Sequence, residues 1–209
     1  MNKYTFFWGG IFSQWARFDM SIDGITFNCC EQYMMYSKAK FFGDEETAKE
    51  IMKSTNPAEQ KRLGRKVKNF NTELWNKVCF SIVYKANYAK FSQNPTLKEG
   101  LLATEDRILV EASPEDRIWG IGMGVENTGI SDPANWQGSN LLGFALTLVK
   151  QELKYVKPVG KHESKFEVCT RCGTRTPYLI TDDINLRFWY VEGAGQLCER
   201  CHTEIYKDE

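Results

Sequence analysis

The sequence has no net charge, only two histidines and no long apolar run. Its 27 Lys and Arg residues balance 27 Asp and Glu residues, so it lacks the cationic excess that an overall electrostatic grip on nucleic acid or membrane requires. The longest later apolar stretch, 141–149, is under half of the roughly 20 residues that a membrane helix needs. Its 42% hydrophobic and 26% charged residues exclude disorder, collagen and coiled coil and indicate a globular protein.

The start of the chain also lacks the pattern of a signal peptide. Lys3 is followed by a mostly apolar stretch over 5–12, but Gly9 and Gly10 interrupt it and no small-residue cleavage site follows. Repeats and low-complexity tracts are absent too. We therefore predict a cytoplasmic protein that does not associate with membranes.

The seven cysteines fall into two groups. Cys29, Cys30 and Cys79 lie in helical or apolar patterns, whereas the other four form two Cys-x-x-Cys pairs near the C-terminus. Each pair places two thiolates on a tight turn, which suits a tetrahedral zinc ion, and disulfides would need an oxidising compartment. We predict a structural Zn²⁺ and no organic cofactor. The predicted ligands are Cys169, Cys172, Cys198 and Cys201.

The hydrophobic pattern predicts a mainly α (α+β) domain followed by a small β-rich, zinc-ribbon-like domain. Short strands precede residue 28, and a further strand is expected over 107–112. Ser113-Pro114 with Asp116 is expected to begin another turn of helix. Helices are predicted over 30–42, 44–54, 72–89, 95–103 and 141–153, with one more opening at Pro57. The predicted domains are 1–154 and 166–209, joined by a linker over 155–165.

Glu31 lies at the start of the first predicted helix and has two alternative roles. Asn28 is expected to be the N-cap, and Glu31 three residues later would complete a capping box. Glu31 would then bond the Asn28 amide, or it would act as a general acid or base. Lys40 lies nine residues further, roughly 13.5 Å along the helix axis, so the two side chains must lean together to share a substrate.

A basic run and several tryptophans are further features with open interpretations. The run is either a phosphate or pyrophosphate site, with an arginine forking across two oxygens, or a solvated helix face. The tryptophans either stack on a nucleobase or fill the core. The basic run consists of Lys61, Arg62, Arg65, Lys66 and Lys68, and the tryptophans are Trp8, Trp15, Trp75, Trp119 and Trp136.

A series of short motifs, in order over about residues 4–154, resembles the NADAR family, also called YbiA-like. The series opens with Phe7-Trp8-Gly9-Gly10 and Phe27-Asn28-Cys29-Cys30-Glu31-Gln32-Tyr33. It continues through Leu63-Gly64-Arg65-Lys66-Val67, Asn69-Phe70 with Trp75, and Leu109-Val110-Glu111-Ala112-Ser113-Pro114. It closes with Asp116-Arg117-Ile118-Trp119-Gly120 and Trp136-x-Gly138-x-Asn140-Leu141-Leu142-Gly143. The cysteine-rich tail lies outside the resemblance.

The resemblance implies a compact, mainly helical domain that binds ADP-ribose-like ligands and hydrolyses N-glycosidic bonds. Its implied substrates are ADP-ribose attached to guanine, or phosphoribosylated pyrimidine intermediates of riboflavin synthesis. The implied catalytic residues are Glu31, Lys40 and Asp116. The implied substrate-binding residues are Trp8, Arg65, Lys66, Trp75, Trp119 and Asn140.

Breaking an N-glycosidic bond leaves positive charge on C1′ and negative charge on the departing base. Glu31 would stabilise the first, activate water or act as the acid, while Lys40 would donate a proton or attack C1′ as an amine. We expect hydrolysis of guanine-linked ADP-ribose, in DNA, RNA or a nucleoside. The alternatives are the riboflavin intermediates and a non-catalytic ADP-ribose or NAD reader.

The tail has two open roles. It would bring the enzyme to nucleic acid, or it would be a structural or protein-docking unit whose partner is unknown. Residues 151–209 contain 9 basic and 10 acidic residues, so no strong field attracts phosphate there. The available cations are Arg171, Arg175, Arg187 and Arg200.

Overall fold

The computed structural model describes residues 3–155, 166–179, 182, 184, 187–192 and 194–206. The chain divides into two compact units, Met1–Val156 and Lys157–Glu209. The predicted domains fall one in each unit. Of the predicted linker, only Tyr155 lies among the described residues, and it ends the last helix of the first unit.

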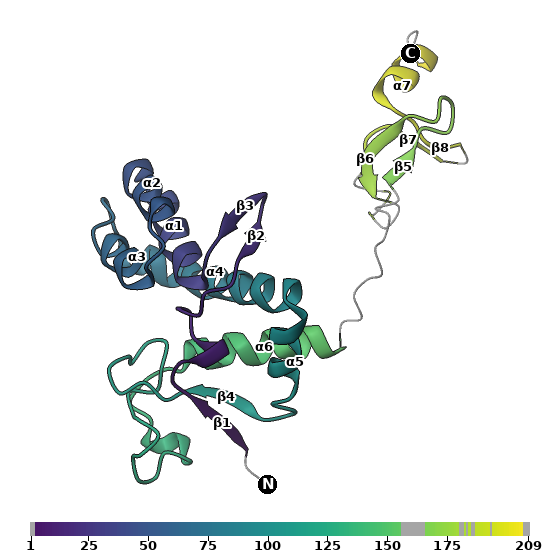
Figure 1. The fold of residues 1–209 in the computed structure, drawn as a ribbon. Coiled ribbons are helices and arrows are strands. Elements are labelled where there is room, and N and C mark those ends of the chain that lie inside the picture. Colours follow the sequence, from purple (N-terminus) through teal and green to yellow (C-terminus); the bar gives the residue numbers. More distant parts are fainter. Residues whose placement is uncertain are drawn as a thin grey trace. The chain divides into compact units, whose positions relative to one another are not determined.

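The first unit is mainly helical with two small sheets, as the mainly α (α+β) prediction requires (Figure 1). Its strands are β1 (Tyr4–Phe7), β2 (Met20–Ile22), β3 (Ile25–Phe27) and β4 (Ile108–Glu111). Its α-helices are α1 (Cys30–Phe41), α2 (Glu45–Lys53), α3 (Pro57–Gly64), α4 (Thr72–Gln93), α5 (Pro95–Leu102) and α6 (Leu141–Tyr155). Two short 3₁₀ helices are η1 (Gly10–Phe12) and η2 (Pro133–Asn135).

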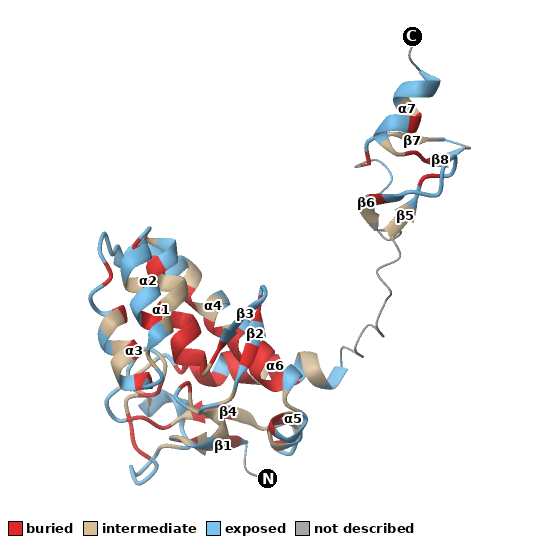
Figure 2. Cartoon of the chain, turned by 45° about the horizontal axis from the view of Figure 1, so that its top comes forward, coloured by how far each residue is buried: buried red, intermediate tan, exposed pale blue. Residues whose placement is uncertain are grey.

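Helix α4 is the centre of the first unit, because it packs on both α1 and α6. Buried residues follow these three helices (Figure 2). Val83 and Phe91 of α4 are fully buried and share one core cluster with Leu146 of α6. Burying each such side chain contributes roughly 1.5–3 kcal/mol, so this cluster supplies a large part of the unit's stability.

Strands β1 and β4 are distant in sequence but pair in parallel, with Tyr4 opposite Ile108 and Phe7 opposite Glu111. Asn140, just before α6, joins this pair to the helix. Its side-chain oxygen accepts a hydrogen bond from the Glu111 backbone N–H at 2.9 Å, and its amide donates to the Leu109 carbonyl at 3.1 Å. The carboxyl end of β4 therefore has a fixed position against α6.

The predicted short strands near the N-terminus are confirmed as a hairpin of β2 and β3. Asp23 and Gly24 form its turn, with φ of 52° and 79°. Two successive positive φ angles are typical of the type I′ turn that Asp-Gly favours. Met20 and Phe27 are buried and pack beside Cys30 and Tyr33 of α1.

The predicted turn of helix at Ser113-Pro114 is wrong. No helix occurs over 113–124, where the backbone follows bends and turns. The Asp116 side chain accepts hydrogen bonds from the backbone N–H groups of Ile118 and Trp119, at 2.9 and 2.8 Å. Longer-range backbone bonds hold this segment instead of a helix, since the Ile121 N–H donates to the Glu111 carbonyl at 2.9 Å and the Asn140 N–H to the Gly120 carbonyl at 3.1 Å.

The second unit is small and β-rich, with one helix. Strand β5 (Phe166–Val168) pairs antiparallel with β6 (Arg175–Leu179), and β7 (Tyr190–Val191) with β8 (Gly195–Gln196). Helix α7 spans Glu199–Ile205. This arrangement is consistent with the predicted zinc-ribbon-like domain. Across the described part of both units, we find no helix with the length and apolar character needed to cross a membrane.

Candidate functional site

A cleft of about 830 Å³ opens on the first unit. This volume is in the range of small-molecule and cofactor sites. Side chains from α1, α3 and α4 line it together with the loop after β1 and the segment that begins at the end of β4. Its charged lining consists of Glu31, Lys38, Lys61, Arg65, Glu111, Glu115, Asp116 and Arg117, and its aromatic lining of Trp8, Trp15, Trp75 and Trp119.

Glu31 lies in the cleft because the first helix is capped differently from the prediction. Cys29, not Asn28, is the N-cap, and its sulfur accepts a hydrogen bond from the Gln32 backbone N–H at 3.4 Å. The Gln32 side chain in turn accepts from the Asn28 N–H at 2.8 Å. Gln32 thus has the capping position predicted for Glu31, whose carboxylate is available to the cleft.

The environment of Glu31 suits proton transfer near neutral pH. Its side chain is buried, and burial raises the pKa of Glu31 to about 7. The charges of Lys61 and Arg65 and a hydrogen bond from Trp15 oppose the rise in this pKa, while the charge of Asp116 adds to it. A carboxyl with a pKa near 7 can both accept and release a proton at neutral pH.

The lysine beside Glu31 is Lys38 rather than Lys40. Lys38 lines the cleft, with its Nζ 4.0 Å from the ring centre of Phe70. Burial, followed by the charge of Arg65, lowers the pKa of Lys38, although the charge of Glu31 acts in the opposite direction. Lys40 is exposed, forms an ion pair with Glu45 and does not line the cleft.

Helical geometry explains this correction. At about 100° per residue, nine residues turn the helix by roughly half a circle, so Lys40 projects away from Glu31. Seven residues complete about two turns, which brings Lys38 onto the same face as Glu31. The predicted catalytic role of Lys40 beside Glu31 therefore has no support in this geometry, and the spacing of the two residues already indicated why.

We expect Lys38→Met to lower kcat/KM for the enzyme's substrate about 100-fold or more, as loss of a positioned proton-transfer or nucleophilic group does. Lys40→Met is the matched control, since it removes a lysine from the opposite face of α1, and should change kcat/KM less than about twofold. Steady-state kinetics of both variants test this. Equal losses in the two variants would contradict the assignment of Lys38.

Two members of the basic run line the cleft. Lys61 and Arg65 are four residues apart, at the end of α3 and just beyond it, and share one face. Arg62 instead pairs with Glu59. Lys66 is exposed and is not among the residues that line the cleft, so its predicted substrate contact has no support in this geometry.

Four of the five tryptophans that are candidates for stacking on a base border the cleft. Trp8 and Trp15 are 67% and 44% exposed, whereas Trp75 is buried. The indole faces of exposed tryptophans are available for stacking on a planar ring. Trp136 instead packs edge-on against Tyr4 and donates a hydrogen bond to the Ile130 carbonyl at 2.7 Å, which is a structural role.

The wall formed by β4 and the following segment contributes acids. Asp116 lines the cleft, and its carboxylate accepts a hydrogen bond from the Trp119 backbone N–H at 2.8 Å. Asn140 is fully buried and does not line the cleft, and its hydrogen bonds to β4 give it a structural position. Sequence reasoning missed Glu111, although a carboxylate at the carboxyl end of a strand is a typical place for function.

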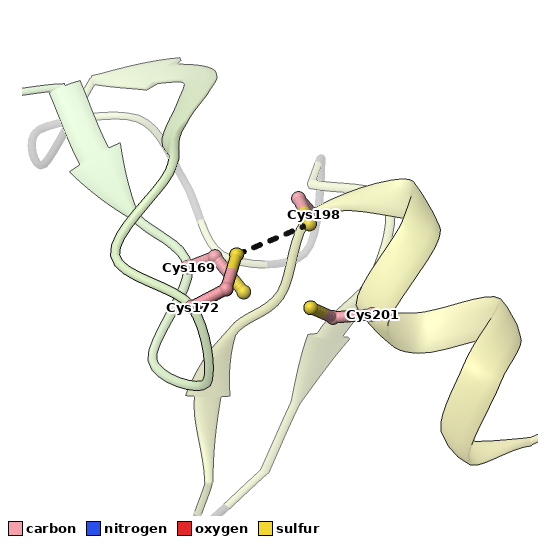
Figure 3. A group of neighbouring side chains, drawn as sticks. All are labelled: Cys169, Cys172, Cys198 and Cys201. Atoms are coloured by element: carbon pink, nitrogen blue, oxygen red, sulfur yellow. Dashed lines mark hydrogen bonds between the residues drawn. The ribbon is translucent and has the colours of Figure 1, made fainter.

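The four predicted zinc ligands come together in the second unit. Figure 3 shows the sulfurs of Cys169 and Cys172, from the turn after β5, facing those of Cys198 and Cys201 at the start of α7. Their sulfur atoms all lie within 4.8 Å of one another, and those of Cys172 and Cys198 are 3.8 Å apart. Tetrahedral zinc with bonds of about 2.3 Å needs sulfurs about 3.8 Å apart, so the donor set fits zinc.

Taken together, the cleft brings proton-transfer groups, cations and aromatic rings into one place. It combines two glutamates with a pKa near 7, the cations Lys61 and Arg65, and exposed indoles. The NADAR domain family matches residues 6–154, and the chain belongs to this family.

Similar proteins extend the match. "N-glycosidase R617" of Acanthamoeba polyphaga mimivirus is 43% identical over 165 residues, covering 72% of this chain and 96% of that protein. "N-glycosidase YbiA" of Escherichia coli is 31% identical over 148 residues, covering 71% and 84%. The NMR structure of E. coli YbiA aligns with a TM-score of 0.63 and 29% identity, covering 78% of this chain and 91% of YbiA.

A plant relative is named differently. "Riboflavin biosynthesis protein PYRR, chloroplastic" of Zea mays is 33% identical over 151 residues, which cover 68% of this chain but 22% of the maize protein. The similarity is therefore to one part of a longer plant protein.

Proposed function

We propose that this protein releases ADP-ribose from guanine in DNA, RNA or a nucleoside by hydrolysing the N-glycosidic bond. The general activity, hydrolysis of N-glycosyl bonds, follows from the NADAR family and its N-glycosidase relatives. The single observation that supports this substrate most is the arrangement of Lys61 and Arg65 beside Glu31 in one tryptophan-lined cleft.

The residues divide the substrate between them. Arg65 and Lys61 would hold the diphosphate, since a guanidinium forks across two phosphate oxygens. Trp8, Trp15 or Trp119 would stack on a base. Glu31 would then lie next to the ribose.

Glu31 and Lys38 would act at C1′. As a carboxylate, Glu31 would stabilise the positive charge that develops on C1′ and take a proton from the attacking water. The lowered pKa of Lys38 increases its neutral amine form, which is able to attack C1′ in place of water. Both routes need Glu31 as a proton acceptor.

The cysteine cluster supports a second part of the proposal, a structural Zn²⁺ in the second unit. The tail's arginines offer little to nucleic acid, because Arg171 and Arg200 pair with Glu204, and Arg187 pairs with Glu167. Arg175 lies over the Phe166 ring, 3.5 Å from its centre. We therefore propose that the cleft, and not the tail, selects the substrate.

The plant relative supports an alternative substrate, a phosphoribosylated pyrimidine intermediate of riboflavin synthesis. Such a molecule shares the ribose phosphate joined through C1′ to nitrogen but has no adenosine. A third alternative is a reader that binds ADP-ribose without turnover.

One assay separates these three alternatives. The full chain is incubated with a guanine-ADP-ribosylated oligonucleotide and, separately, with the phosphoribosylaminopyrimidine, and products are resolved by chromatography. Release of free ADP-ribose supports the proposal. Turnover of the pyrimidine alone overturns it in favour of the riboflavin intermediate, and binding of ADP-ribose without any product supports the reader.

A further inference from the structure

We infer that Glu111 is the catalytic acid that protonates the departing base. The inference rests on the proposed function, because it assigns a residue to that reaction. It arises from a carboxyl that faces the cleft and that no other role in the fold explains.

The backbone of Glu111 is held from two sides. Its N–H donates to the Asn140 side chain at 2.9 Å, and its carbonyl accepts from the Ile121 N–H at 2.9 Å. Glu111 is also the last residue of β4, paired with Phe7 of β1. The side chain therefore starts from a rigid position at the cleft wall, as a catalytic group requires.

The side chain of Glu111, unlike its backbone, is not fully satisfied by hydrogen bonds. Its Oε2 is buried and has no hydrogen-bond partner among the residues that the structure describes. A buried oxygen that lacks a bond is uncommon and calls for an explanation. In a cleft that binds a ligand, the simplest explanation is that the ligand supplies the partner.

The charges around Glu111 favour its protonated form. Burial raises the pKa of Glu111 to about 7, with further increases from the charges of Asp116 and Glu31 and a decrease from Lys61. Glu31 has more groups that favour its charged form, namely Lys61, Trp15 and Arg65. The remaining charged groups of the cleft lining are Lys38, Glu115 and Arg117. Since both pKa values lie near 7, either glutamate can hold a proton at neutral pH, and we assign the proton to Glu111 because Trp15 and Arg65 favour the charged form of Glu31.

A cation site is a poorer explanation for these acids. Among the described residues, the tail cysteines are the single group of three or more metal-type ligands close enough to hold one ion. Glu31, Glu111 and Asp116 thus line one cleft without forming such a group. Two glutamates that line one cleft instead match the acid and base pair that glycoside hydrolysis uses.

The complete step balances with these two residues. The C1′–N bond breaks, its electron pair goes to the base, and the Glu111 carboxyl proton moves to the base. Water oxygen bonds to C1′, and the water proton that is lost moves to the Glu31 carboxylate. The products are ADP-ribose with a C1′ hydroxyl and the neutral base, and proton exchange with solvent restores both glutamates.

The test uses two substrates that differ in their need for an acid. ADP-ribosyl guanine needs a proton on departure, whereas its 7-methylguanine analogue is already cationic and departs as a neutral base. We expect Glu111→Gln to lower kcat about 100- to 1000-fold on the first and less than about threefold on the second. The loss of activity at alkaline pH should also disappear in this variant on the first substrate.

Controls separate this role from a structural one. Asp106→Asn removes an exposed carboxyl that precedes β4 and pairs with Lys154, and should leave both rates unchanged. Glu111→Asp keeps the acid and should retain more activity than Glu111→Gln on the first substrate. Equal loss on both substrates, or no loss, would overturn the assignment of Glu111. Wild type inactive on both substrates would instead overturn the proposed function.

Discussion

Replacing Glu31 by Gln is expected to lower kcat by about 100- to 10,000-fold and, at the same time, to stabilise the first unit at alkaline pH. The loss follows from removing the group that accepts the proton from the attacking nucleophile. Gln keeps the size and the hydrogen-bonding capacity of the side chain, so the cleft should still bind ADP-ribose. Steady-state kinetics measure the loss of kcat, and calorimetry on the same preparation measures the binding of ADP-ribose.

The gain in stability follows from the pKa of Glu31. Folding raises this pKa from 4.5 to about 7, so the charged form is disfavoured in the folded state. The stabilisation by the protonated form is complete below pH 4.5 and is lost as pH rises through 7. Glu31→Gln avoids that loss and should increase the free energy of unfolding by about 1–3 kcal/mol at pH 8, with almost no increase at pH 4.

Urea unfolding of wild type and variant at pH 8 and pH 4 measures this difference. Glu45→Gln is the control, because Glu45 is exposed on α2 and pairs with Lys40, a contact that contributes about 1 kcal/mol at most. A variant that loses activity and is also less stable at pH 8 would show that Glu31 is a structural residue. An active variant would remove Glu31 from the chemistry.

Sequence periodicity predicted most of the helices but not which side chains face the cleft. The apolar spacing of α4 and α6 is dictated by burial on one face, so those helices follow from the pattern. Helix α1 packs on α2, α3 and α4, and these tertiary contacts determine which of its faces borders the cleft. Helical spacing relative to Glu31 would have favoured Lys38.

The acids of the β4 wall illustrate a second limit. Glu111 and Glu31 are 80 positions apart in the sequence, and parallel pairing of β4 with β1 together with the Asn140 bonds brings them to one cleft. Neither the strand pairing nor the Asn140 bonds can be inferred from the residues next to Glu111 in the sequence. The cysteine cluster is the opposite case, since two Cys-x-x-Cys turns specify a tetrahedral donor set wherever they meet.

Removing the metal is expected to unfold the second unit while the first unit stays folded. Among the described residues of the second unit, the buried hydrophobic residues are Cys169, Leu197 and Cys201, so two of the three are predicted ligands. A core this small cannot offset the entropy of ordering the chain. Binding of structural zinc contributes an apparent 10–16 kcal/mol, which makes folding of this unit dependent on the metal.

Three measurements test the metal dependence. Elemental analysis of the purified chain should give one zinc per chain, and a chelator should make 166–206 sensitive to protease while residues 3–155 stay resistant. Cys198→Ser should have the same effect without chelator, whereas Cys79→Ser, in α4 and outside the cluster, should retain its zinc.

Since the proposed active site lies wholly in the first unit, cleavage of a short ADP-ribosylated guanine nucleoside should persist after chelation. A second unit that stays protease-resistant without metal would contradict a structural zinc, and loss of nucleoside cleavage would show that the second unit contributes to the reaction.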